Sequence, residues 1–125
     1  MWSVELAPEP ASATQARSLT REQLASICPP DTLDTIALLV TELVTNAILH
    51  ARTPVQLQIE TRSDRVRLSV QDASNRQPEL RGFAPDAVAG RGLALVEALA
   101  SSWGVEATPS GKVVWCEIAL NDTTR

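Results

Sequence analysis

The sequence predicts an α+β fold, a two-layer sandwich in which about three helices cover one face of a mixed, mostly antiparallel sheet. Three observations lead to this class. Apolar residues recur at helical spacing up to residue 51, a period-two alternation follows, and a further helical segment precedes two more short alternating runs. A sheet whose strands are apolar on one side buries only that face. The helices are therefore expected to pack together on this one face of the sheet.

The length and charge of the chain limit its organisation and its partners. A chain of 125 residues fits one domain, and we expect residues 1–125 to form a single domain around one core. The net charge of −4 gives no overall attraction to nucleic acid or to an anionic membrane, so neither is an expected partner.

The N-terminus and the cysteines indicate a cytoplasmic protein. The opening residues are acidic and interrupted by proline, unlike a secretory leader. We expect no apolar run to approach the roughly 20 residues that span a bilayer. Cys28 and Cys116 are too few for a disulfide framework or a cysteine-based zinc site, and we expect two reduced thiols.

The first half of the chain predicts one edge strand and two helices. Residues 2–6 fit a short edge strand, and residues 13–27 have helical spacing up to the Pro29-Pro30 pair. Asp31 is a predicted N-cap of a second helix, which Thr53-Pro54 ends. The apolar positions of this helix are Leu33, Ile36, Ala37, Val40, Leu43, Val44, Ala47, Ile48 and Ala51.

The second half predicts four strands and one helix. Residues 55–60 and 65–71 alternate apolar with polar side chains around a turn at residues 62–64, which is typical of an antiparallel hairpin. Residues 73–89 show no period and form a long loop, which in a small domain is more often functional. A third helix is predicted at residues 93–101, followed by strands at residues 105–107 and 113–120.

A stripe of polar residues on the second helix is the first candidate site. Glu42, Asn46 and His50 recur every fourth residue on the side away from the apolar series. A solvated polar face explains them simply. Leu38, Leu39 and Leu49 share that side, however, and a mixed face of this kind also fits contact with a ligand or a second surface.

Asp72 is the second candidate. It continues the parity of Val66, Leu68 and Val70, so its carboxylate is predicted to point toward the helix-covered face at the end of its strand. It either caps the Asp-Ala-Ser loop through local amides or accepts a hydrogen bond from the exocyclic amine of a base.

Gly90-Arg91-Gly92 at a helix start is the third. The free amides and the dipole of a helix N-terminus attract anions, and glycine lets a phosphate approach the backbone. A glycine-rich turn without a ligand is the simpler alternative.

The order and spacing of these features resemble a known family. Glu42-x-x-x-Asn46 on a helix, Asp72 after a strand, and then Gly90-Arg91-Gly92-Leu93 resemble the N, G1 and G2 boxes of the GHKL ATP-binding superfamily, which has the Bergerat fold. NAILHA and the ending GKVVWCEIAL look most like the stand-alone anti-sigma-factor serine kinases of actinobacterial type.

The resemblance implies a role for each residue. Asn46 corresponds to the residue that coordinates Mg²⁺, Glu42 to the group that acts on the attacking nucleophile, and Asp72 to the acceptor for the adenine amine. Gly90, Gly92 and the helix that they open correspond to the phosphate-binding segment, in which Leu93 completes the motif. The resemblance adds Arg91 as a phosphate partner, His50 as a residue lining the same region, and Ser74 as a contact to a water or to the base edge.

Two positions depart from the family pattern. The G1 box usually reads Asp-x-Gly, whereas this chain has Asp72-Ala73-Ser74. Where the family often has threonine beside a glycine near the last strand, this chain has Gly111-Lys112, so one nucleotide contact is either missing or replaced by lysine.

Three functions follow as alternatives. The first is a Mg²⁺-ATP-dependent serine kinase that phosphorylates an anti-sigma-factor antagonist and binds a sigma factor in its absence. The second is a partner-binding module on the same fold that binds nucleotide without catalysis or not at all. The third is a small α+β domain without a ligand. The resemblance also suggests a homodimer.

Overall fold

The computed structural model describes residues 1–73 and 88–120 of the chain. Its elements in these residues follow the order βααββαββ, and each belongs either to one sheet or to the helical layer that covers it. They are β1 (Trp2–Leu6), α1 (Ala11–Leu24), α2 (Pro30–Ala51), β2 (Val55–Thr61), β3 (Arg65–Asp72), α3 (Val88–Leu99), β4 (Ser102–Thr108) and β5 (Gly111–Ala119).

The strands form one five-stranded sheet in the order β1-β2-β3-β5-β4. Every neighbouring pair is antiparallel, so the expected mixed sheet is corrected to an antiparallel one within the described residues. The predicted hairpin of β2 and β3 is confirmed, and β1 lies at an edge as predicted.

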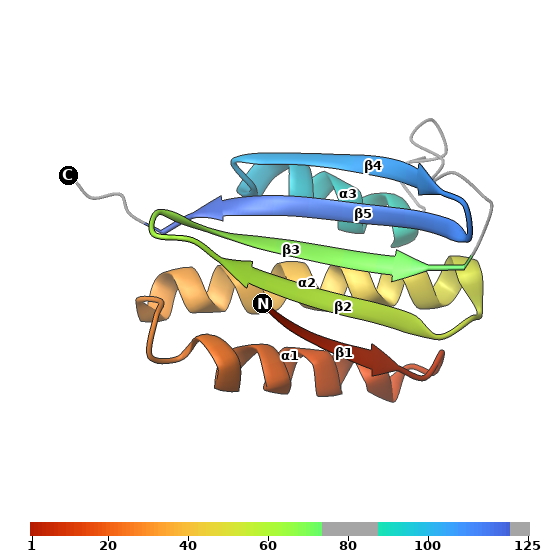
Figure 1. Cartoon of the computed structure of the whole chain (residues 1–125), viewed down its shortest axis with the longest axis horizontal. Helices are drawn as coiled ribbons and strands as arrows, with labels where there is room; N and C mark the ends of the chain where they lie inside the picture. The colour runs from red at the N-terminus through yellow and green to blue at the C-terminus, as the bar shows by residue number, and fades with distance from the viewer. Residues whose placement is uncertain (74–87, 121–125) are drawn as a thin grey trace.

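The helices cover one face of this sheet, and the two-layer α+β prediction is confirmed. Figure 1 shows α1, α2 and α3 behind the strands, with α2 between the other two. The alternation explains the layering, because the inward side chains of β2 and β3 are buried under α2 while their neighbours face outward. The buried apolar positions of these two strands are Val55, Leu57, Ile59, Val66, Leu68 and Val70.

α2 begins two residues earlier than predicted and lacks the predicted cap. Pro29 is its N-cap residue, Pro30 opens the helix, and Asp31 lies in the first turn without a side-chain capping hydrogen bond. Proline suits the first helical position because it has no N–H that needs a partner and its φ is already near the helical value. The helix ends at Ala51, shortly before the Thr53-Pro54 pair that was predicted to end it, and Arg52 closes it in the left-handed region, with φ 56°.

α2 is longer and more apolar than expected, so the prediction that no apolar run approaches a membrane span is wrong for this helix. By length and composition this 22-residue helix could cross a membrane. In the fold it packs against β2, β3 and both other helices, and eight of its residues are buried. Its apolar character is accounted for by this position at the centre of the core.

The boundaries of the other helices differ from the predictions. α1 ends at Leu24, and a turn in which the Ile27 amide bonds to the Leu24 carbonyl follows, so the helix is shorter than the predicted 13–27. α3 begins at Val88 instead of residue 93. Glycine is a poor helix former, which made Gly90 and Gly92 look like the end of a loop, yet both are accommodated in the first turns.

Candidate functional site

The candidate residues gather at one end of the molecule. Figure 1 shows that β3 ends, α2 ends and α3 begins at the same end. A hydrogen bond joins two of these segments, because the Ala73 amide donates to Thr53 Oγ1, which lies between α2 and β2, at 3.3 Å. This bond fixes the end of β3 beside the connection between α2 and β2, so residues that are distant in the sequence lie close together.

Asp72 lies where its parity predicted. It is the last residue of β3, it continues the inward series of Val66, Leu68 and Val70, and only 4% of it is exposed. The alternative role as a cap of its own loop is not seen at Ala73, whose amide bonds to Thr53 instead. Ser74, the other member of that alternative and a candidate contact to the base, lies outside the described residues.

Asp72 is held by a lysine across the strand pair. Lys112 lies opposite Asp72 in the register of β3 and β5, and its Nζ donates to Oδ1 at 3.1 Å and to Oδ2 at 3.0 Å. Both side chains are buried, with 2% of the Asp72 side chain and 5% of the Lys112 side chain exposed. A buried carboxylate needs such donors, since burial without them is costly.

Gly111 allows this close approach of the strands. A Cβ built on Gly111 would lie 1.9 Å from the Asp72 carbonyl oxygen and 2.7 Å from the Ala73 Cα. No side chain fits there without a shift of the backbone. Glycine at this position therefore lets the ends of β3 and β5 meet beside the ion pair.

The polar stripe of α2 is half-buried. Glu42, Asn46 and His50 are each neither fully buried nor fully exposed, and none of their side chains takes part in a hydrogen bond or ion pair among the described residues. Leu38 and Leu49 on the same side are exposed. Leu39 was expected on this side as well, but it is completely buried, because its 100° offset from Leu38 turns it into the core.

The glycine motif occupies the first turns of α3. Gly90, Arg91, Gly92 and Leu93 all lie within the helix that starts at Val88. The first four N–H groups of a helix have no partner within it, and they carry the positive end of the dipole. Figure 1 places this helix start at the end of the molecule where β3 ends, so an anion bound there would lie at the same end as Asp72, the last residue of β3.

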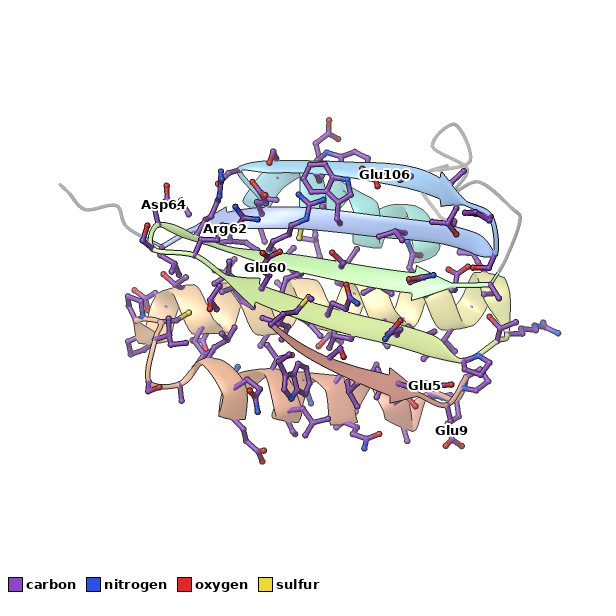
Figure 2. The ribbon with its side chains drawn as sticks, in the orientation of Figure 1. Glu5, Glu9, Glu60, Arg62, Asp64 and Glu106 are labelled. Carbon is purple, nitrogen blue, oxygen red and sulfur yellow. The ribbon has the colours of Figure 1, made fainter. Side chains whose placement is uncertain are left out.

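One pocket at this end opens on the other face of the sheet. Its volume is about 250 Å³, and its lining includes Glu5, Gln56 and Gln71, whose side chains point away from the helices. Figure 2 labels Glu5 at this end of the strands. Asp72 also lines this pocket, whereas no residue of the polar stripe does.

The cysteines are buried thiols and not candidate nucleophiles. Burial raises the pKa of Cys116 to about 12, and it also raises the pKa of Cys28. A thiol with so high a pKa is protonated at neutral pH, and the thiolate is the reactive form. The two cysteines are not bonded to each other, as expected for reduced thiols.

Sequence comparison assigns the family. The chain matches the family model of the histidine kinase-like ATPase domain over residues 6–118. It belongs to the histidine kinase-like ATPase (GHKL) family. The match includes all three residues of the polar stripe, Asp72 and the start of α3, so the resemblance seen in the three motifs is confirmed as family membership. No curated protein gives a match.

Several solved structures share the fold of this chain. The chain is similar to the RsbU and RsbW domains of a Mycobacterium tuberculosis protein, with a TM-score of 0.69 and 21% identity over 100% of this chain and 34% of that one. The blue-light-activated histidine kinase of Erythrobacter litoralis gives a TM-score of 0.60 and 25% identity, over 89% and 41% of the two chains. The catalytic domain of the histidine kinase ThkA gives 0.55 and 22%, over 96% and 98%. This chain thus spans about a third of the mycobacterial structure.

The sequence did not predict the ion pair that Lys112 forms with Asp72. The position of Lys112 beside the glycine of the last strand was noted as a departure, but the register that places it opposite Asp72 was unknown. One signal was present in the sequence. Lys112 shares the parity of Val114, Cys116 and Ile118, which marks it as an inward residue of β5.

Proposed function

We propose that this chain is a Mg²⁺-ATP-dependent regulator of the anti-sigma-factor type, which transfers the γ-phosphate of ATP to a serine of an antagonist protein. One observation carries the proposal. In a chain of the histidine kinase-like ATPase family, a buried carboxylate ends β3 on the helix-covered face, at the end of the molecule where α2 ends and α3 begins. One ligand at this end can reach a hydrogen-bond acceptor for its base at the end of β3, a side-chain amide on α2 and an anion site at the start of α3.

Asn46 fits the part of a single protein ligand for Mg²⁺. Mg²⁺ is commonly bound by one or two protein oxygens together with substrate phosphates and water, and a single side-chain amide suits such a site. The half-buried Asn46 makes no side-chain hydrogen bond within this part of the chain, which leaves its amide oxygen to a ligand. Bound Mg²⁺ supplies charge neutralisation for the phosphates.

Glu42 fits the part of the base. It lies one turn before Asn46, about 6 Å along the helix axis at 1.5 Å per residue, which separates the nucleophile from the cation. The substrate serine oxygen forms a bond to the γ-phosphorus, the bond from that phosphorus to the β,γ-bridging oxygen breaks, and ADP leaves. The Glu42 carboxylate takes the proton of the serine hydroxyl.

The remaining candidates would hold the nucleotide. We assign the phosphates to the amides of Gly90, Arg91, Gly92 and Leu93 at the start of α3, where the helix dipole favours negative charge. Asp72 is assigned to the base end of the nucleotide, where its carboxylate is also paired with Lys112. His50, one turn beyond Asn46, and Ser74, two residues beyond Asp72, are assigned to the margins of the same ligand.

The partners and compartment follow from the same proposal. A sigma factor and an anti-sigma-factor antagonist are the protein partners, and residues 1–125 act as one ATP-binding domain that can pair as a homodimer. The mycobacterial structure of similar fold includes an RsbW domain, which supports this class of partner. Two reduced thiols and a net charge of −4 support a cytoplasmic site of action without nucleic acid or membrane.

A second candidate function is a partner-binding module without catalysis. The buried ion pair between Lys112 and Asp72 favours it, because the carboxylate proposed for the base is already engaged. The Asp72-Ala73-Ser74 sequence, in which serine replaces the expected glycine, favours it as well.

Transfer of labelled phosphate from ATP to candidate antagonist proteins separates the two functions. We expect Glu42→Gln to lower the transfer rate by about 10²- to 10⁴-fold, the usual contribution of a general base, with ATP affinity close to that of the unmodified protein. Glu60→Gln is the matched control, since Glu60 lies on β2 in an ion pair with Arg62 at 3.0 Å, toward the turn away from the site (Figure 2).

The outcomes are distinct. Equal transfer by Glu42→Gln and Glu60→Gln would remove Glu42 from the catalytic role. Partner binding without any transfer by the unmodified protein would favour the second function.

A further inference from the structure

Lys112 is the only lysine of the chain, and it is buried against the carboxylate proposed to select the base. Ten arginines carry the other positive side chains. A lysine ammonium is strongly hydrated, so burial is favourable only where a fixed anion compensates. Asp72 provides that anion with both of its oxygens, at 3.1 and 3.0 Å.

The ammonium and an adenine amine are donors to the same group. A hydrogen bond from a charged donor is roughly twice as strong as one from a neutral donor. The exocyclic amine of adenine is neutral, whereas Lys112 carries a full charge and reaches both carboxylate oxygens. An incoming base therefore cannot replace Lys112 without losing a stronger interaction.

We propose that Lys112 is a specificity-determining residue, which occupies the base-selecting carboxylate and so lowers both the affinity for ATP and the preference for adenine. The inference rests on the proposed nucleotide site. The unmodified protein is then expected to bind a nucleoside triphosphate through its phosphates, with little preference for a base that carries the exocyclic amine.

The position of Lys112 supports a role in selection over a role in folding alone. β3 and β5 pair along their whole length, and Val70 opposite Val114 and Leu68 opposite Cys116 already fill the interior beside the pair. An apolar pair at the next inward step would continue this core. A buried ion pair gives little net stability over an apolar pair of similar volume.

Binding of two nucleotides to three proteins tests the inference. The nucleotides are Mg-ATP and Mg-inosine triphosphate, which carries a carbonyl where ATP carries the amine. The proteins are the unmodified chain, Lys112→Met and Arg67→Met. Arg67→Met is the matched control, because it also removes one positive charge from an ion pair, with Glu117 at 3.1 Å, but on the uncovered face of the sheet.

We expect the unmodified chain and Arg67→Met to bind the two nucleotides with dissociation constants within about threefold of each other. In Lys112→Met we expect ATP to bind at least about tenfold more tightly than in the unmodified chain, the value of one hydrogen bond to a charged group. The dissociation constant of inosine triphosphate should stay within about threefold, because no donor replaces the amine.

Two results would overturn the inference while leaving the nucleotide site intact. One is a folded Lys112→Met protein that binds ATP equally or more weakly than the unmodified chain, which would show that Lys112 does not compete with the amine for Asp72. The other needs no variant: a preference of tenfold or more for ATP in the unmodified chain would show that Asp72 selects the amine with Lys112 in place. Binding of neither nucleotide to any of the proteins would overturn the proposed function as well.

Discussion

Gly111 controls how closely β3 and β5 approach beside Asp72. Its missing side chain leaves room for the Asp72 carbonyl, and the next residue, Lys112, then points inward to the carboxylate. Glycine carries an entropic cost in a strand, so it is expected where a backbone contact requires it. The geometry of the ion pair thus depends on Gly111, which has no side chain.

Replacing this glycine should lower the free energy of unfolding. A Cβ on Gly111 meets backbone atoms at 1.9 to 2.8 Å, which only a movement of β3 can relieve. We expect Gly111→Ala to cost roughly 3 kcal/mol, the upper range for overpacking, in urea unfolding.

Gly104→Ala is the comparison for this experiment. Its Cβ would meet the Trp115 ring at 2.9 Å, and a side chain can tilt where a backbone cannot. We expect a smaller loss, about 1 kcal/mol. Equal losses for the two variants would show that the contact between Gly111 and Asp72 is less rigid than the strand register indicates.

α2 is the element that joins the core to the candidate site. One side is buried against the sheet and the neighbouring helices, while Glu42 and Asn46 lie half-buried on another side between exposed leucines. A helix can serve both purposes because residues one position apart differ by 100° in direction. The core side fixes the helix in place, and the other side can then be specialised for a ligand.

Adjacent leucines test this division of α2. Leu39 is 0% exposed and Leu38 is 40% exposed. We expect Leu39→Ala to lower the free energy of unfolding by about 2 to 5 kcal/mol through lost burial and a cavity, and Leu38→Ala by less than about 1 kcal/mol. Denaturant unfolding of both variants measures this directly. Similar losses would mean that the Leu38 side of the helix is also covered.

Periodicity predicted the elements better than it predicted their ends. The apolar series of α2 and the alternation of β2 and β3 each report burial directly, so these elements were found with one or two residues of error. The starts of α2 and α3 were misplaced because Pro30 and two glycines read as breaks, although all three are tolerated in a first turn.

The candidate site was predicted in part for the same reason. The parity of a strand decided where Asp72 points, and this was confirmed. The partner of Asp72 depended on the register of β3 with β5, strands separated by a helix and a long connection, and local sequence carries little information about such pairing. Lys112 could therefore be noted as a departure but not placed against Asp72.

At the scale of the whole molecule, the order of the sheet assembles the site. The strand that ends at Asp72 is central, α2 lies beneath it, and α3 returns along the same face from the same end (Figure 1). Asn46, Asp72 and the start of α3 are far apart in the sequence, and the fold turns them toward one end. The central claim is that a single Mg²⁺-bound nucleotide contacts all three.

An NMR titration of amide chemical shifts with Mg-ATP tests this claim most directly. The protein is labelled uniformly, and nucleotide is added to millimolar concentration, since Lys112 is expected to weaken binding. We predict saturable shifts that cluster at Asn46, at Asp72 and at residues 90–93, and that shrink when magnesium is removed. Gln58 and Ser69, on the uncovered face of the sheet, serve as reporters of nonspecific effects. Saturable shifts confined to that face, or none at any of the three segments, would contradict the account.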